Sequence, residues 1–197
     1  NKAYVDQVAQ GLDTKPSTKA ASTANLTATY SNGSAGVGAT LTNSGSQAAL
    51  TLDGVTLVVA DRVLIKDQTT AAQNGIYVVT TVGDGSSNWV LTRATPEDQP
   101  TELSGGAFVF VEQGTLNANN GYVFTHTGNP TFGTTALDVA QFSGAGQITA
   151  GAALTKSGNQ MDVAVDDSSI EVNADALRVK ALGITNAMLA GSIDGAK

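Results

Sequence analysis

Residues 154–184 read LTKSGNQMDVAVDDSSIEVNADALRVKALGI and carry apolar side chains at alternate positions. This alternation predicts short β-strands, and the Ser-Gly-Asn, Asp-Asp-Ser-Ser and Asn-Ala-Asp clusters predict turns between them. Strands this short cannot build a core, because an isolated hairpin is marginal in water and a stable sheet needs three or more strands with a shared apolar face. We therefore expect something outside this stretch to cover its apolar residues.

The preceding region, from about Thr23 to Gly144, is predicted to be strand after strand, because runs of β-branched and aromatic residues alternate with turn clusters. Asp53-Gly54 is typical of a two-residue hairpin turn, and Asn74-Gly75 is expected to open the next strand in a similar way. No convincing amphipathic helix interrupts the pattern, which favours an antiparallel β-sandwich or small barrel. The predicted strands are residues 26–30, 48–52, 55–59, 62–66, 76–82, 89–93, 107–111, 122–125 and 137–142.

Both ends of the chain are expected to contain short helices. Val5, Val8 and Leu12 have helical spacing, but a helix of about ten residues is marginal without tertiary contacts. This segment alone leaves two sources of such contacts equally open, a self-associating seam and docking on the adjacent domain. Near the other end, residues 185–190 are expected to form one helical turn that Gly191 terminates.

These patterns predict a mainly β chain with a linear layout rather than a single globule. A short helix and linker would occupy residues 1–19, a β-sandwich or barrel domain residues 20–146, and a β-rich segment ending in a helical turn residues 147–197. The chain starts with Asn1 rather than Met and ends at Lys197, just after an Asp-Gly turn. We therefore expect it to be a piece of a longer polypeptide.

Composition argues against several classes of partner. The chain has 17 Asp and Glu against 10 Lys and Arg and a net charge of -7, whereas phosphate binding needs clustered positive charge, so nucleic acid is not expected. No apolar run is long enough to cross a bilayer, so no membrane partner is expected either. The absence of Cys excludes disulfides and thiolate chemistry. Stability must then come from packing or from association.

Candidate catalytic and metal-binding residues are sparse, and we expect no enzyme activity and no cofactor. His126 is the single histidine, and a lone histidine in a loop is more often a surface residue than a general base. Glu97, Asp98 and Glu102 could supply a pair of carboxylates, but only their separation in space would decide this. The clusters at 84–88 and 166–168 lack the full calcium-loop pattern and are expected to be solvated turns.

Several segments resemble those that recur in the tail-fibre and related appendage proteins of tailed bacteriophages. The resemblance covers nearly the whole chain and keeps the order of the segments. It is carried by NKAYVDQVAQGLDTK (1–15), by the stretch from ASTANLTATY to IYVVTTV (21–82), by NWVLTRATPED (88–98), by GAALTKSGNQMDVAV (151–165) and by GITNAMLAGSI (183–193).

The resemblance implies a non-enzymatic, homotrimeric protein of the virion that connects the virus body to a receptor-binding tip. Its partners would be two further copies of itself, other tail or baseplate proteins and a host surface glycan. In such fibres three chains wrap around one axis and cover each other's apolar residues. The other two chains would then supply the cover that residues 154–184 need. The N-terminal helix would then be a short three-stranded coiled coil. The trimer interface would comprise Val5, Val8, Leu12, Met161, Val163, Val165, Ile170, Val172, Leu177, Val179, Met188 and Leu189.

Two alternatives remain open at this point. A carbohydrate-binding or adhesin module would be favoured by an exposed cluster of Trp89 and Tyr122 facing carboxylates, although burial is the default expectation for both side chains. A polysaccharide-cleaving tailspike would need two carboxylates that converge between chains, and it ranks lower because the chain lacks a long repeated β-helix.

Overall fold

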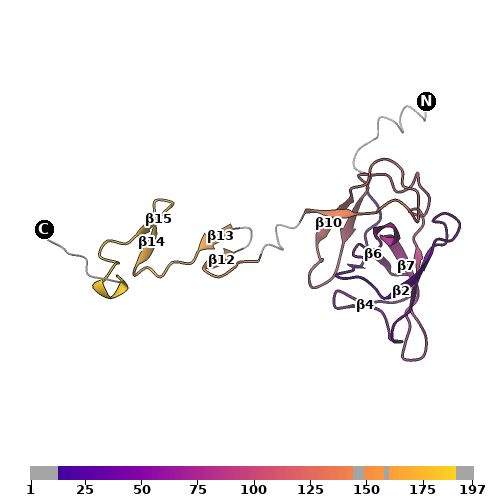
Figure 1. Cartoon of the computed structure of the whole chain (residues 1–197), viewed down its shortest axis with the longest axis horizontal. Helices are drawn as coiled ribbons and strands as arrows, with labels where there is room; N and C mark the ends of the chain where they lie inside the picture. Colours follow the sequence, from indigo (N-terminus) through magenta and orange to yellow (C-terminus); the bar gives the residue numbers. More distant parts are fainter. Residues whose placement is uncertain (1–12, 144–148, 158–159, 190–197) are drawn as a thin grey trace. The chain divides into compact units, whose positions relative to one another are not determined.

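The computed structural model describes residues 13–143, 149–157 and 160–189 (Figure 1). The chain divides into two compact units, residues 1–144 and 145–197, which are treated separately below. Among the described residues, the only helical elements are the 3-10 segments η1 (Ala71–Gln73) and η3 (Asn186–Met188). The prediction of a mainly β chain is confirmed. The expected N-terminal helix at Val5, Val8 and Leu12 lies outside the described residues.

A six-stranded sheet is the centre of the first unit, with strand order β1-β6-β7-β8-β3-β2. All its pairings are antiparallel except that of β1 with β6, which is parallel. The sheet has two free ends in this order and does not close, so the barrel alternative is wrong. Its strands are β1 (Ala20–Ala21), β2 (Ala28–Ser31), β3 (Thr40–Asn43), β6 (Arg62–Ile65), β7 (Gly75–Thr81) and β8 (Val90–Arg93).

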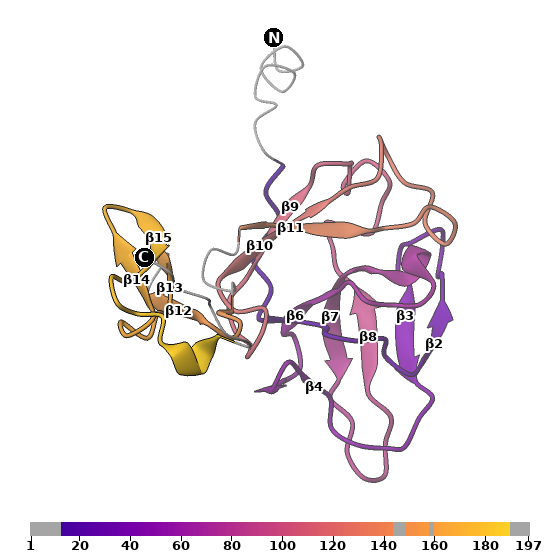
Figure 2. The same ribbon diagram turned by 60° about the vertical axis from the view of Figure 1, so that its left-hand side comes forward.

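A second, three-stranded antiparallel sheet packs on one face of the first. It contains β9 (Phe108–Val111), β10 (Asn120–Phe124) and β11 (Val139–Ser143) in the order β11-β10-β9, and β11 runs crosswise to β7 and β8 in the view of Figure 2. Leu64 and Ile76 of the large sheet share one buried cluster with Val109 and Phe124 of the small one. This cluster is the core between the two sheets.

The opposite face of the six-stranded sheet is covered by its own loops. Val63, Tyr77 and Leu91 share a second buried cluster with Leu52 and Trp89. Leu52 belongs to a small hairpin formed by β4 (Thr51–Leu52) and β5 (Val55–Thr56). Because the sheet is covered on both faces, successive side chains of β6 are all buried, as Val63, Leu64 and Ile65 are. This is why β6 is a continuous apolar run rather than an alternating one.

The two predicted tight turns have different outcomes. Asp53 and Gly54 both have positive φ, 50° and 78°, and join β4 to β5 as expected for a two-residue hairpin. Asn74-Gly75 opens a strand as expected, since Gly75 is the first residue of β7, but it does so without a two-residue hairpin turn, because Asn74 caps η1 with φ of -64°. Gly75 is needed for space, since a Cβ there would lie 2.2 Å from Nη1 of the buried Arg93.

Residues 13–19, expected to be part of a linker, pair with the β-domain. Phe108 N donates to Asp13 O at 2.7 Å, and Lys15 N donates to Phe108 O at 2.7 Å. Farther along, Thr18 N donates to Phe110 O and Lys19 N donates to Arg62 O, both at 2.8 Å. The chain therefore passes from the edge of the three-stranded sheet to the edge of the six-stranded sheet and ties the two together.

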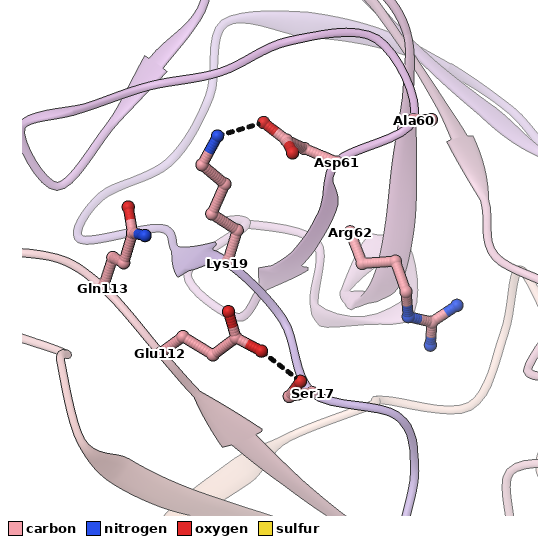
Figure 3. Close-up of a pocket in the computed structure, with 7 residues that line it drawn as sticks. All are labelled: Ser17, Lys19, Ala60, Asp61, Arg62, Glu112 and Gln113. Carbon is pink, nitrogen blue, oxygen red and sulfur yellow. Dashed lines mark hydrogen bonds and ion pairs between the residues drawn. The ribbon is translucent and has the colours of Figure 1, made fainter.

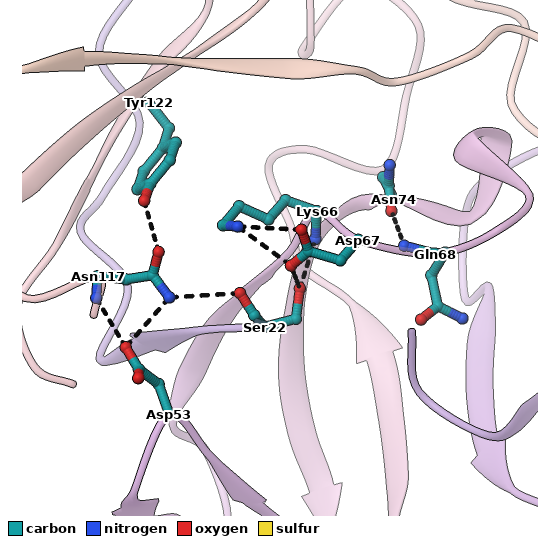
Figure 4. Close-up of polar contacts among 8 residues, drawn as sticks. All are labelled: Ser22, Asp53, Lys66, Asp67, Gln68, Asn74, Asn117 and Tyr122. Atoms are coloured by element: carbon teal, nitrogen blue, oxygen red, sulfur yellow. Dashed lines mark hydrogen bonds and ion pairs between the residues drawn. The ribbon is translucent and has the colours of Figure 1, made fainter. Parts of the chain in front are cut away.

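A buried polar network also connects the two sheets (Figure 4). The Asn117 side chain accepts a hydrogen bond from the Tyr122 hydroxyl at 2.5 Å and donates to Ser22 O at 3.3 Å and to the Asp53 carboxylate at 3.1 Å. One amide thereby joins β10, the end of β1 and the β4–β5 turn. Buried polar groups of this kind are costly to leave without partners.

The second unit consists of two hairpins and η3. Strands β12 (Leu154–Ser157) and β13 (Gln160–Val163) form the first hairpin, and β14 (Ile170–Asn173) and β15 (Ala176–Val179) form the second. Each is a two-stranded sheet. The predicted short strands are therefore present, and no third strand joins either pair among the described residues.

Replacing Asn117 tests the network. We expect Asn117→Ala to lower the free energy of unfolding by roughly 1–3 kcal/mol, because the Tyr122 hydroxyl and Ser22 carbonyl lose a buried partner. Urea unfolding followed by Trp89 fluorescence measures the change. Gln113→Ala, at an exposed position in the same connection between β9 and β10, is the control and should differ little from wild type. Equal destabilisation by both substitutions would contradict this role for Asn117.

A buried ion pair makes stability depend on pH in a defined direction. Glu97 is fully buried and accepts a hydrogen bond from Arg62 Nη2 at 2.8 Å, while its other carboxylate oxygen has no partner. Burial raises the pKa of Glu97, and the Arg62 guanidinium offsets part of this rise. Between the ordinary carboxyl pKa and the raised one, the folded state binds a proton that the unfolded state has lost, so stability falls as pH rises.

Glu97→Gln removes this titration. The free energy of unfolding of wild type minus that of the variant should decrease as pH rises from the ordinary carboxyl pKa through the raised one, as measured by urea unfolding at a series of pH values. Glu112→Gln, at an exposed glutamate of the same unit, corrects for the general effect of removing a carboxylate. A difference between wild type and Glu97→Gln that is independent of pH would show that the pKa of Glu97 is not raised.

Candidate self-association surface

The β14–β15 hairpin separates its apolar and polar side chains by strand geometry. Its register pairs Ile170 with Val179 and Val172 with Leu177, and side chains two positions apart on a strand point to the same face. All four apolar side chains therefore share one face. On the other face, Glu171 and Arg178 form an ion pair at 2.7 Å.

The turns on either side of β14 fix this hairpin. Ala174 and Asp175 have positive φ, 48° and 60°, as in the tight turns whose twist matches antiparallel strands. Before the hairpin, the Asp166 carboxylate accepts hydrogen bonds from the backbone N–H groups of Ser168, Ser169 and Ile170. These donors hold the pKa of Asp166 well below its usual range. The start of β14 is thus fixed by a local side-chain cap.

The β12–β13 hairpin has the same division. Leu154 lies opposite Val163, and Lys156 lies opposite Met161, so three apolar side chains and one lysine share a face. Thr155, Ser157, Gln160 and Asp162 belong to the other face by the same alternation. We call the apolar sides of the two hairpins the hairpin faces; they comprise Leu154, Met161, Val163, Ile170, Val172, Leu177 and Val179.

The hairpin faces remain accessible to solvent. Val163 is 45% exposed, Val172 52%, Leu177 58% and Val179 53%, while Met161 and Ile170 are half-buried. The described residues of the chain therefore do not cover them. Apolar side chains gathered on one face mark an interaction surface far more often than scattered apolar side chains do.

The other predicted interface residues have less regular positions. Val165 is half-buried beyond the end of β13, Met188 in η3 is 56% exposed, and Leu189 is half-buried. The C-terminal expectation was a helical turn over residues 185–190, and the described part contains the three-residue η3. Val5, Val8 and Leu12 lie outside the described residues.

Sequence reasoning missed some apolar residues of this unit. Leu154 belongs to the hairpin faces because it pairs with Val163, but its own strand, LTKS, contains one apolar residue and shows no alternation. Leu182 and Ile184 are also exposed. A signal for Leu154 exists in the sequence, because the Ser-Gly-Asn cluster at 157–159 predicts a turn between two strands and so sets which residues should pair.

The residues examined for catalysis have structural partners. One ring nitrogen of His126 is 3.0 Å from Leu103 O, and its ring packs edge-on to Phe124. Asp98 accepts a hydrogen bond from Thr95 Oγ1 at 2.9 Å, and Glu102 accepts one from Gln99 N at 3.1 Å. With Glu97 bonded to Arg62, this segment does not present a free pair of carboxylates.

The two acidic turns use their oxygens internally. Asp84 accepts hydrogen bonds from the backbone N–H groups of Ser86 and Ser87, both at 2.7 Å, which lower the pKa of Asp84 to about 2. Asp166 is bonded in the same way. Within residues 13–143, 149–157 and 160–189, no group of three or more His, Cys, Asp or Glu side chains could hold a metal ion.

A polar cavity of about 370 Å³ lies beside the N-terminal segment (Figure 3). Lys19 pairs with Asp61 at 2.7 Å across it, and Ser17 donates a hydrogen bond to Glu112. Arg62, at the cavity wall, is bonded to Glu97. Each charged side chain in the cavity thus has a partner, and its lining contains no aromatic residue.

The aromatic residues that the carbohydrate-binding alternative requires are buried. Trp89 belongs to the cluster on one side of the six-stranded sheet, and Tyr122 belongs to the cluster on the other side. The two rings therefore cannot form one exposed site. The expectation of burial is confirmed for both.

No helix among the described residues is long and apolar enough to cross a membrane.

Comparison with known proteins identifies no relatives. No protein-family model, curated protein or solved structure matches the chain.

Proposed function

We propose that the chain is a structural segment of a bacteriophage tail fibre, in which three identical copies share one axis and connect the virion to a receptor-binding tip. In this proposal residues 147–197 form a shaft, and the hairpin faces of the three copies pack together around the axis. Other tail or baseplate proteins bind the fibre at its virion end. No residue has a catalytic role.

The observation that carries this proposal is the exposure of the hairpin faces. Two strands bond only the backbone groups that point toward each other, and they cannot cover the side chains on their own apolar face. A two-stranded sheet is therefore marginal in water. The same face on an identical copy is a complementary cover, because symmetric association brings equivalent apolar side chains together. The hairpins support the need for a partner, and the resemblance to tail fibres supports the number three.

The polar faces of the hairpins fit an exposed shaft surface. Glu171 and Arg178 are paired at 2.7 Å, and Gln160 Nε2 donates to the Asp162 carboxylate at 2.7 Å. Side chains satisfied within their own chain can remain in water when the opposite face is buried. Each hairpin thus has one side suited to solvent and one suited to a partner.

Two cross-strand pairs in one hairpin provide a matched test. Val172→Asp/Leu177→Asp places two carboxylates on the hairpin face, and Asn173→Asp/Ala176→Asp places two at the adjacent pair on the polar face. We expect light scattering to give a mass near three times 19.8 kDa for wild type and for the polar-face variant. The apolar-face variant should be monomeric, because charge without a partner is costly to bury.

The light-scattering results distinguish the trimeric fibre from the alternative functions. A monomeric wild type would overturn the trimeric fibre and leave a single-chain module as the function. A trimer that survives both pairs of substitutions would place the association surface outside the β14–β15 hairpin. Circular dichroism of each variant is the control that tests whether the β-domain stays folded.

A further inference from the structure

The three-stranded sheet has a second apolar surface, on the side that faces away from the core. Val109, Val111 and Tyr122 point into the core, so their neighbours Phe108, Phe110 and Val123 point outward by the alternation of strands. We call this outward surface the aromatic face; it comprises Phe108, Phe110, Val123, Ala140 and Phe142.

The register places these residues together. Val123 lies opposite Phe108 on one side and opposite Ala140 on the other, which makes one row across the three strands. The rings of Phe108 and Phe142 meet edge to face, with centroids 5.7 Å apart. The surface is therefore continuous from β9 across β10 to β11.

The described residues of the chain leave this surface open. Phe142 is 67% exposed and Phe110 is 38% exposed, although each is large enough to bury roughly 150–250 Å² in a packed interface. An outward sheet face in water is ordinarily polar, as the alternation of antiparallel strands allows. Three phenylalanines on it indicate a surface that is covered in the assembled protein.

The position of the aromatic face in the chain indicates what covers it. Strand β11 ends at Ser143 and the shaft segment is described again from Thr149, so the chain between these residues spans at most roughly 20 Å. If three shafts share an axis, the three β11 strands must end close to it. Phe142 is the penultimate residue of β11.

We propose that the aromatic face is where the β-domains of the three copies contact one another at the start of the shaft. This inference rests on the proposed trimeric fibre and adds a second contact to it. In the proposed fibre the shaft already holds the three copies together, so this contact does not have to hold them by itself.

The absence of cysteine allows a direct test with spin labels on the full chain. Ala140→Cys places one label on the β11 side of the aromatic face. Gln47→Cys places the control label in the exposed loop beside the β7–β8 connection, where Leu50 N bonds to Val82 O. Figure 2 shows that connection at the end of the six-stranded sheet far from β11.

In a trimer, we expect a shorter and narrower distribution of interchain distances for labels at position 140 than for labels at position 47. Adding Phe110→Ser/Phe142→Ser should lengthen and broaden the distances at position 140 while light scattering still gives a trimeric mass. That combination supports contact through the aromatic face and shows that the shaft holds the trimer.

Other outcomes overturn the inference in distinguishable ways. A trimeric mass with distances at position 140 as long and broad as at position 47 would leave the fibre proposal intact and reject contact between β-domains. Labels that are immobile but far apart would mean that another part of the same chain covers the face. A monomeric mass would reject this contact together with the trimeric fibre.

Discussion

A two-stranded β-hairpin pairs only the backbone groups that its strands point toward each other, and it cannot cover its own side chains. The second unit of this protein is built from two such hairpins, and each gathers its apolar residues on one side. Glu171 and Arg178 form an ion pair on the polar side, and Val172 and Leu177 face out on the other. The proposed assembly follows from this constraint, because a face that no described residue covers is suited to a partner.

The β-domain meets the same constraint within one chain. Its six-stranded sheet is apolar on both sides, and each side has a cover: the three-stranded sheet on one and the β4–β5 hairpin with its flanking loops on the other. Asn117 and the segment 13–19 hold these layers together through hydrogen bonds. The domain is thus complete in itself except at the outer side of the small sheet.

Sequence patterns predicted most strands but not how the strands pair into sheets. Val63 to Ile65 and Ile76 to Val79 were recognisable because β-branched and aromatic residues dominate both runs. Strand β3 was missed because TLTN contains one apolar residue, and β1 was missed because two alanines carry no periodic signal. Their pairing depends on residues distant in the sequence, which local patterns cannot show.

The surface residues show the same limit. The alternation of Ile170, Val172, Leu177 and Val179 predicted a shared face, and the register of β14 and β15 places them on one. Leu154 was missed because its own strand has no other apolar residue and its partner Val163 belongs to a different strand. The aromatic face was missed because the run at 107–111 predicts a strand without indicating which of its sides is buried, and in the structure Val109 and Val111 lie in the core. Propensity identified the strand, and only the packing of two sheets decided which side faces outward.

The two apolar surfaces would contribute differently to a fibre. The hairpin faces lie in a unit that has little else to stabilise it, so in the proposed assembly folding and association of the shaft are coupled. The aromatic face belongs to a domain that is already folded, and in the proposed fibre the shaft rather than this face holds the copies together. A short connection to a common shaft raises the effective concentration of such surfaces to about the millimolar range. Weak contacts at the start of the shaft can then close, and they limit the movement of each β-domain relative to the axis.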